Sequence, residues 1–305
     1  MKTVIKARIS AVVMTTLALV SIQGTLLGGA DEFTLDSARS AAEKGDVKAL
    51  YFLGKRCAKG DGVPQDYAKA AEYLRQSAEH GYALAQNDLG AFYAKGLGVK
   101  QDYQEAAKWY CMAAENGDSL AQYSVGLIYS LGRGVPKDMQ ESLKWFKKAA
   151  EQNQPGALAA LGDIYLNGRE SIPIDYKESF KWFQKAVEQG HFSALNSLGC
   201  LYEQGLGVDR NFAQAMKCFR EAAEKGDARG QMNLGRMYLN GSGVQSDLTE
   251  AYKWLCLAFK NGEPVANHYL MELEVNKSLT AQEMDEARRR ADKFMKSARE
   301  EKVKD

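Results

Sequence analysis

Residues 81–116 read GYALAQNDLGAFYAKGLGVKQDYQEAAKWYCMAAEN, and the chain repeats this pattern six times. Two segments with apolar residues at helical spacing flank a glycine-rich loop, which is typical of a two-helix unit. One glycine marks each copy, and successive copies lie 36 or 37 residues apart: Gly54, Gly90, Gly126, Gly162, Gly199 and Gly235. A fixed period of this length predicts stacked helical units with a long binding surface rather than a pocket.

Each unit carries signals for the end of its first helix and the start of its second. A glycine follows the first helix, where a left-handed residue ends a helix without steric cost: Gly60, Gly96, Gly132, Gly168, Gly205 and Gly241. A residue that favours the N-cap precedes the second helix: Asp66, Asp102, Asp138, Asp175, Asn211 and Asp247. In five units Glu or Gln follows three residues later, at capping-box spacing. We therefore interpret these carboxylates as helix caps, not as a metal or catalytic array.

Aromatic residues recur at one position of each helix. A tyrosine position on the first helix is shared by five units: Tyr93, Tyr129, Tyr165, Tyr202 and Tyr238. All four tryptophans share one position on the second helix: Trp109, Trp145, Trp182 and Trp254. Aromatic side chains dominate core packing, so we expect both positions to lie in the core.

The recurring pattern A-x3-LG-x2-Y-x2-G-x-GV-x2-D-x2-(E)A-x2-W-x3-AA-x2-G resembles the Sel-1-like repeat, a branch of the tetratricopeptide superfamily. The resemblance covers residues 45–261 as six units, with bounds 45–80, 81–116, 117–152, 153–189, 190–225 and 226–261. It implies an all-α fold, a right-handed α/α superhelical solenoid, that serves as an adaptor or protein-binding scaffold. The fourth unit departs from the pattern because its loop after Gly168 is one residue longer and lacks the second glycine.

Residues 1–30 have the features of an export signal. Lys2, Lys6 and Arg8 precede an uncharged, mostly apolar stretch, and Gly28 and Ala30 are small residues suited to cleavage. An uncleaved membrane anchor is the alternative, because residues 9–30 are just long enough to span a bilayer. We favour cleavage, which predicts a periplasmic or secreted bacterial protein without stable membrane insertion.

Partial units are expected at both ends of the repeat array. Residues 31–44 match the tail of a second helix and predict an N-terminal capping helix. Residues 262–305 predict C-terminal capping helices and a frayed tail, with Thr280 and Glu283 at capping-box spacing. Such ends supply the polar outer side that a solenoid needs for solubility. The arginine run 288–290 is interpreted as a solvated helix face because acidic residues flank it.

Charge and motifs point away from nucleic acid, cofactors and catalysis. The formal net charge is +1, and loss of the three basic signal residues brings the chain close to neutrality. The three histidines lack metal-ligand spacing, and no serine-nucleophile or phosphate-loop motif occurs. We therefore expect no catalytic residue, no cofactor and no metal site.

The cysteines leave one alternative function open. Some cysteine-rich relatives of this repeat family are described as β-lactamases or penicillin binders, so a cell-wall or β-lactam-directed hydrolase is the alternative. Those relatives carry a regular cysteine pair in each unit, which is missing here. Of the five cysteines, only Cys200 and Cys218 are candidates for a disulfide, and we favour buried thiols.

We expect the partner-binding surface on the first helices, which line the concave side of a two-helix solenoid. Its candidate residues occupy positions that vary between units: Phe52, Lys55, Lys59, Asp88, Lys95, Ser124, Leu127, Leu131, Asp163, Asn167, Gln204, Asn233, Arg236 and Asn240. Spacings of three and four residues place each group on one helix face. The sequence thus predicts an exported, non-catalytic scaffold for a protein or peptide partner, in the bacterial envelope or on a host factor.

Overall fold

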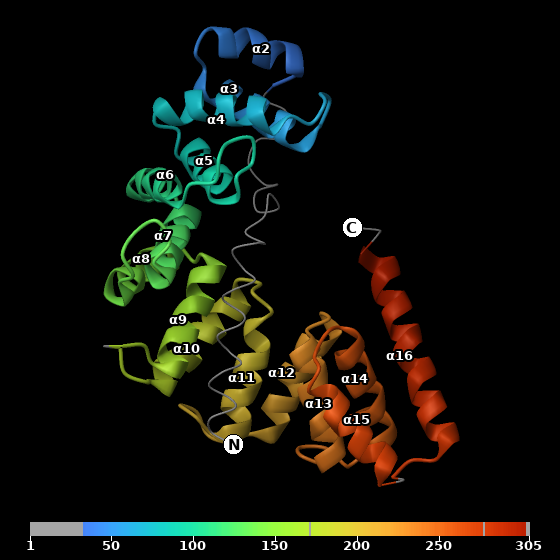
Figure 1. Cartoon of the computed structure of the whole chain (residues 1–305). Coiled ribbons are helices and arrows are strands. Elements are labelled where there is room, and N and C mark those ends of the chain that lie inside the picture. Colours follow the sequence, from blue (N-terminus) through green and yellow to red (C-terminus); the bar gives the residue numbers. More distant parts are fainter. Residues whose placement is uncertain (1–32, 171, 277, 303–305) are drawn as a thin grey trace. The chain divides into compact units, whose positions relative to one another are not determined.

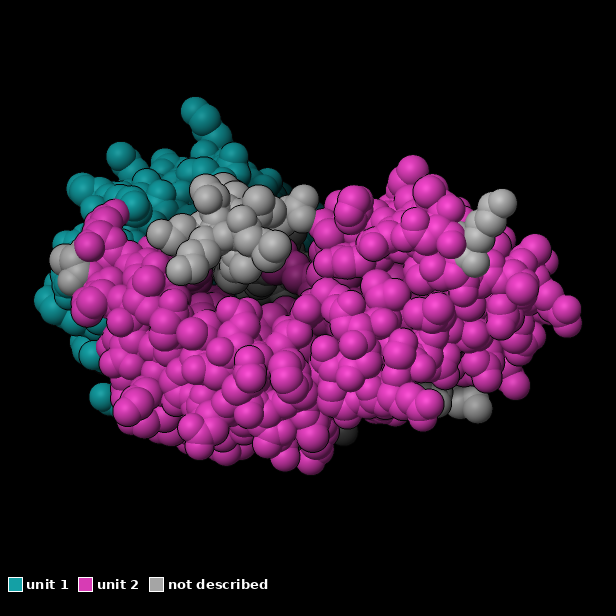
Figure 2. All heavy atoms as spheres, turned by 90° about the horizontal axis from the view of Figure 1, so that it is seen from below, with its two compact units in different colours: residues 1–152 teal, residues 153–305 magenta. Residues whose placement is uncertain are grey.

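The computed structural model describes residues 33–170, 172–276 and 278–302 of the chain. Every regular element in these ranges is an α-helix, apart from an isolated bridge between Arg169 and Ile172. The expected export signal, residues 1–30, lies outside the described residues. The chain divides into two compact units, Met1–Gln152 and Asn153–Asp305, which are coloured separately in Figure 2.

Unit 1 contains a capping helix followed by three helix pairs (Figure 1). Its helices are α2 (Leu35–Glu43), α3 (Val47–Lys59), α4 (Tyr67–Glu79), α5 (Ala83–Lys95), α6 (Tyr103–Glu115), α7 (Ser119–Leu131) and α8 (Met139–Glu151). Helices α3, α5 and α7 are the first helices of their repeats, and they pack on α4, α6 and α8 respectively. Helix α2 covers α3, and α4 and α6 also contact the first helix of the next repeat.

Unit 2 contains three further pairs and two closing helices. Its helices are α9 (Pro155–Asn167), α10 (Tyr176–Glu188), α11 (Ala194–Gln204), α12 (Phe212–Glu224), α13 (Ala228–Asn240), α14 (Leu248–Lys260), α15 (Ala266–Val275) and α16 (Ala281–Lys302). Helices α9, α11 and α13 pack on α10, α12 and α14, and α14 also contacts α15 and α16. The predicted all-α repeat solenoid is confirmed in each unit.

The predicted helix caps are present, but the capping boxes of the second helices are only half formed. Each N-cap side chain accepts a hydrogen bond from the N3 amide, as when Asp102 accepts from Glu105. The N-cap amide, however, donates to a first-helix carbonyl at 2.8–3.1 Å: Asp66 to Cys57, Asp102 to Tyr93, Asp138 to Tyr129, Asp175 to Tyr165, Asn211 to Tyr202 and Asp247 to Tyr238. This bond closes the loop, so the N3 glutamate is free to pair with a lysine, as Glu178 does with Lys181 at 2.7 Å.

The two glycines of the loop serve different purposes. The first, such as Gly96 with φ +69°, takes the left-handed conformation that ends the helix. The second, Gly98, lies so close to the backbone carbonyl of Tyr67 that a Cβ atom would overlap it. The missing side chain therefore permits this loop to touch the start of α4, the preceding second helix, and Gly134, Gly207 and Gly243 are placed in the same way in their loops. In the fourth repeat Gly168 keeps a positive φ of 63° but has ψ 158° and so leaves the left-handed helical region, and the Arg169–Ile172 bridge replaces the usual turn.

The core of each repeat is built on the recurring first-helix glycine and the residue that follows the tryptophan position. An alanine Cβ at Gly162 would lie 2.6 Å from Cδ1 and Cε1 of Phe183. Ser179, on the same second helix, donates to the Gly162 carbonyl at 2.8 Å. The equivalent glycines face the following side chains: Leu74, Tyr110, Phe146, Phe219 and Leu255. These contacts bring the two helix backbones close together.

The expectation that both aromatic positions lie in the core holds in part: Trp109, Trp145 and several of the tyrosines pack against the core clusters, but most of these side chains are not fully buried. Trp109, Trp145 and Trp182 are half-buried, and only Trp254 is buried. The shared tyrosines of the first helices are also half-buried. A helix turns about 100° per residue, so the position after the tryptophan is the one that points at the facing glycine. The lysine ammonium groups of Lys148 and Lys185 lie over the Trp145 and Trp182 rings instead.

The ends of the repeat array carry complete capping boxes. Thr34 exchanges hydrogen bonds with Ser37 at the start of α2, and Thr280 does so with Glu283 before α16. The arginine run of α16 forms intramolecular ion pairs, including Arg290 with Glu250 at 3.1 Å. All three arginines are exposed, in agreement with the expected solvated face, and Arg288 and Arg290 also pair with residues of α15 and α14.

All five cysteines are free thiols. Cys57 and Cys256 are buried, and the other three are half-buried. The Cys200–Cys218 pair considered above therefore forms no disulfide in this structure.

We expect Gly162→Ala to destabilise the protein by about 1–3 kcal/mol, because the added methyl group overlaps the Phe183 ring. Alanine would otherwise favour the helix by about 1 kcal/mol. Chemical denaturation measures the change. Adding Phe183→Leu should recover part of the loss, and Gly54→Ala is the milder control because Leu74 can move. Additive losses in the double variant would contradict this packing contact.

Candidate partner-binding face

The candidate residues all lie on the first helices, and we call this set the first-helix face. In unit 1 they lie on α3, α5 and α7, and in unit 2 on α9, α11 and α13. Most are exposed or half-buried. Three of them are buried and offer almost no accessible surface, which corrects the prediction: Ser124 with 4% exposure, Leu127 with 2% and Asn233 with 8%.

The basic end of the face in unit 1 is held by a hydrogen-bonded cluster. Lys55 Nζ donates to Asp88 Oδ2 at 2.7 Å, and Tyr51 Oη donates to the same oxygen at 3.2 Å. Burial, together with the neighbouring Asp88 charge, raises the pKa of Tyr51 far above its usual value. The phenol therefore stays protonated and serves as a hydrogen-bond donor. The cluster fixes the side chains of α3 against α5.

Aromatic and cationic groups surround Phe52 at the same end. The Phe33 ring lies 5.9 Å from the Phe52 ring, and the Arg56 guanidinium lies 4.8 Å from it. Lys59 and Lys95, at the C-terminal ends of α3 and α5, are exposed. This part of the face offers positive charge beside an aromatic surface.

The face in unit 2 is more polar. Arg236 Nη2 pairs with Glu203 Oε2 at 2.6 Å, and Asn233 Nδ2 donates to Asn196 Oδ1 at 2.8 Å. Cys200 lies beside these groups, and burial raises the pKa of its thiol to about 12. The thiol is thus neutral and unreactive at physiological pH. Gln204 and Asn240 are exposed at the ends of α11 and α13.

Asp163 differs from the other acidic residues of the face. Within the part of the chain that the structure describes, its carboxylate forms no hydrogen bond or ion pair. Burial raises the pKa of Asp163 to about 7, while Arg169 and Arg229 act in the opposite direction. The carboxylate is therefore partly protonated at neutral pH and lacks a direct counter-charge.

Sequence reasoning missed Tyr51, Asn196 and Glu203, which complete these clusters. Their partners lie one repeat away at two recurring separations. Lys55–Asp88 and Glu203–Arg236 are 33 residues apart, and Tyr51–Asp88 and Asn196–Asn233 are 37 apart. Complementary residues at these separations would have been the signal to search for.

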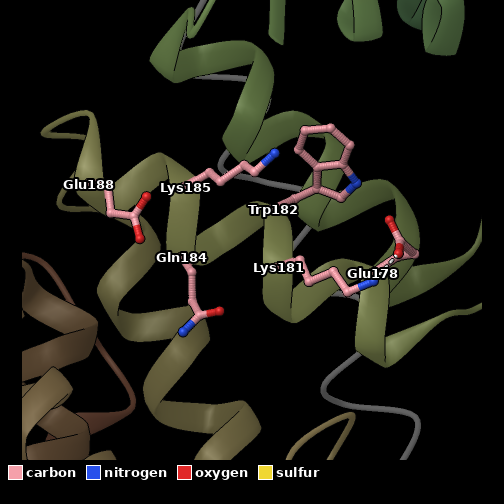
Figure 3. Close-up of a pocket in the computed structure, with 6 residues that line it drawn as sticks. All are labelled: Glu178, Lys181, Trp182, Gln184, Lys185 and Glu188. Atoms are coloured by element: carbon pink, nitrogen blue, oxygen red, sulfur yellow. Dashed lines mark hydrogen bonds and ion pairs between the residues drawn. The ribbon is translucent and has the colours of Figure 1, made fainter. Parts of the chain in front are cut away.

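A shallow pocket lies on one side of α10 (Figure 3). Its lining residues all come from that helix: Glu178, Lys181, Trp182, Gln184, Lys185 and Glu188. Lys185 covers the Trp182 ring, and Lys181 is paired with Glu178. Three of the four charged side chains are thus engaged within α10, and one helix alone supplies the walls, so we assign this pocket no function.

The described residues hold no group of three or more His, Cys, Asp or Glu side chains placed to bind a metal ion. Over the same residues, none of the helices combines the length and apolar character needed to cross a bilayer.

Paired helices, closed loops and a face of variable side chains define an α/α repeat solenoid of the binding-scaffold type. The chain belongs to the Sel1 repeat family, whose model matches residues 47–82, 83–118, 119–154, 155–191, 193–227 and 228–263. Sel1 repeat proteins typically act as scaffolds for protein–protein interaction. No curated protein matched in the comparison.

Two solved structures are similar along most of the chain. One is c5321, described as a protective antigen of uropathogenic Escherichia coli strains with an SLR fold; it is 35% identical with a TM-score of 0.76. That match covers 86% of this chain but 56% of c5321, so this chain spans little more than half of that protein. The other, a Sel1 repeat protein from Oxalobacter formigenes, is 31% identical with a TM-score of 0.70, covering 82% of this chain and 96% of that one.

Leu127→Asp should cost about 3–5 kcal/mol of stability, because it would bury an unpaired carboxylate among core residues of α7. Leu131→Asp, at a half-buried position at the end of the same helix, is the matched control and should cost clearly less. Denaturant titration compares the two variants. Equal, small losses would mean that Leu127 is accessible after all.

Asp163→Asn should stabilise the protein at pH 8 by about 1–2 kcal/mol and have little effect near pH 4. The folded-state pKa is raised, so the wild type loses stability as pH rises through about 7, and asparagine removes this loss. Unfolding free energies at pH 4.5, 6 and 8 test the prediction, with the exposed loop residue Asp209→Asn as the control. A difference that does not vary with pH would contradict it.

Proposed function

We propose that this protein is an exported, non-catalytic scaffold that binds a protein or peptide partner along the first-helix face. The observation that carries the proposal is that repeating and variable positions of the repeat serve different purposes. Repeating residues serve packing, capping and loop closure, whereas the variable residues of the first helices form a face that is mostly polar. Side chains that are already ordered before binding lose less conformational entropy when a partner binds, which favours affinity.

Contacts between repeats support this pre-organisation. The Lys55–Asp88 and Arg236–Glu203 ion pairs each join neighbouring first helices, at 2.7 Å and 2.6 Å. Exposed lysines and amides beside them stay available for a partner. The face thereby combines fixed anchors with free polar groups.

Export is part of the proposal. Residues 1–30 have the charge and apolar pattern of a signal peptide. The similar protein c5321 is described as a protective antigen, and export of the present protein would fit such a relative. The intact mass of the protein recovered from the envelope tests this step; a chain that begins before residue 20 would contradict cleavage.

Charge reversal at Lys59 and Lys95 should reduce partner capture at least about tenfold without changing the melting temperature, because both lysines are exposed on the face. The measurement is affinity capture from the native envelope with the mature chain, quantified by mass spectrometry. Lys147→Glu with Lys217→Glu, exposed on the second helices, is the matched control.

Unchanged capture by Lys59→Glu with Lys95→Glu would contradict the assigned face. Nitrocefin turnover by the purified protein, abolished by replacing a single serine, would contradict the non-catalytic assignment.

A further inference from the structure

The charged residues of the face in unit 2 are neutralised in pairs, with one exception. Arg236 pairs with Glu203, and Arg229 lies 3.9 Å from Glu263. Asp227 caps α13 by accepting from the Gly230 amide at 2.6 Å. Asp163 alone among the acidic residues of α9, α11 and α13 lacks such a partner within the described residues.

The position of Asp163 in the repeat explains why nothing neutralises it. One repeat later, the aligned residue is Cys200, and its neighbours Asn196 and Ser197 are uncharged. Asp88, by contrast, meets Lys55 from the adjacent repeat, and Glu203 meets Arg236. Asp163 is thus the carboxylate of this face that forms no ion pair within the described residues, although the charges of Arg169 and Arg229 lie near enough to oppose the rise of its pKa.

Amide side chains on α9 and α11 can serve the backbone of an extended peptide. Asn167 Nδ2 donates to the Asp163 carbonyl at 3.0 Å, which leaves the Asn167 amide oxygen available as an acceptor. Asn196 uses its oxygen to accept from Asn233, which leaves its amide nitrogen available as a donor. A peptide N–H group could donate to the Asn167 amide oxygen, and a peptide C=O group could accept from the Asn196 amide nitrogen.

Building on the proposed function, we infer that Asp163 selects a lysine or arginine side chain of a peptide laid across α9, α11 and α13. Charge complementarity decides the choice, because a carboxylate without a direct counter-charge favours a cation and disfavours an acidic side chain. The partly desolvated setting strengthens the pairing relative to an exposed surface ion pair.

The same carboxylate lowers the free energy of unfolding at neutral pH, because burial without a partner disfavours its ionised form. A bound cation would relieve that cost. Structural roles such as capping or core packing give no reason for this arrangement, because Asp163 lies in the interior of α9 and its carboxylate accepts no hydrogen bond within the described residues.

The test uses four pools of acetylated, amidated nonapeptides with a central Lys, Arg, norleucine or Glu and flanking positions drawn from Ala, Ser, Gly and Leu. Fluorescence polarisation measures their affinity for the full-length mature chain. We expect the Lys and Arg pools to bind about tenfold or more tightly than the norleucine pool, and the Glu pool to bind more weakly still. The blocked termini exclude a free amino group as the source of the cation.

Asp163→Asn should abolish the preference for Lys and Arg while raising the melting temperature at pH 8, and Asp163→Glu should retain part of the preference. Asp209→Asn, an exposed acid of the same unit, should leave the preference unchanged. The Lys pool should also lower the pKa of Asp163, observed by carbon NMR of its carboxylate, which a merely structural residue would not show.

Equal affinity for the Lys and norleucine pools, no binding of any pool, or a preference that survives Asp163→Asn would overturn the inference. The proposed scaffold would stand separately in each case, provided that Lys59→Glu with Lys95→Glu still reduces partner capture. Loss of that second effect, with the Lys preference intact, would overturn only the assigned face in unit 1.

Discussion

The contact between a first-helix glycine and the ring or leucine that faces it determines how closely the helices of each repeat approach. At Gly162 the Phe183 ring occupies the space of a side chain, and Ser179 donates to the Gly162 carbonyl. Loop closure depends on this spacing, because the second-helix N-cap must reach a first-helix carbonyl at about 3 Å. The same spacing lets the second loop glycine touch the preceding repeat. Packing, capping and stacking are thus linked in one geometry.

Binding capacity arises from the positions that this geometry leaves unconstrained. Neighbouring first helices lie close enough for side chains 33 and 37 residues apart to pair, so each cluster on the face combines two repeats. The effect of a substitution in one repeat therefore depends on the side chain that the neighbouring repeat places beside it. This coupling gives a regular backbone an irregular chemical surface, which is what recognition of one partner among many requires.

Asp163 shows the conflict between stability and recognition on that surface. Its carboxylate is costly to ionise where it lies, and the pKa near 7 expresses this cost. In repeat proteins the free energy of folding is roughly a sum over repeats and the interfaces between them. The stability of the other repeats can therefore offset the cost of one unfavourable charge. Sites of this kind are commonly less stable than their surroundings because they are shaped for a ligand.

The sequence by itself determined the repeat, the helix caps and the loop glycines, because these depend on local backbone geometry and recur at a fixed period. It could not rank neighbouring positions on one helix: the tryptophans looked like core residues, but Phe183 and its equivalents fill the core, one residue and about 100° away. For the same reason Leu127 and Asn233 were placed on the surface although they are buried. The pairing of Lys55 with Asp88 and the isolation of Asp163 were decided only by tertiary structure, because both depend on which side chains adjacent repeats bring within reach.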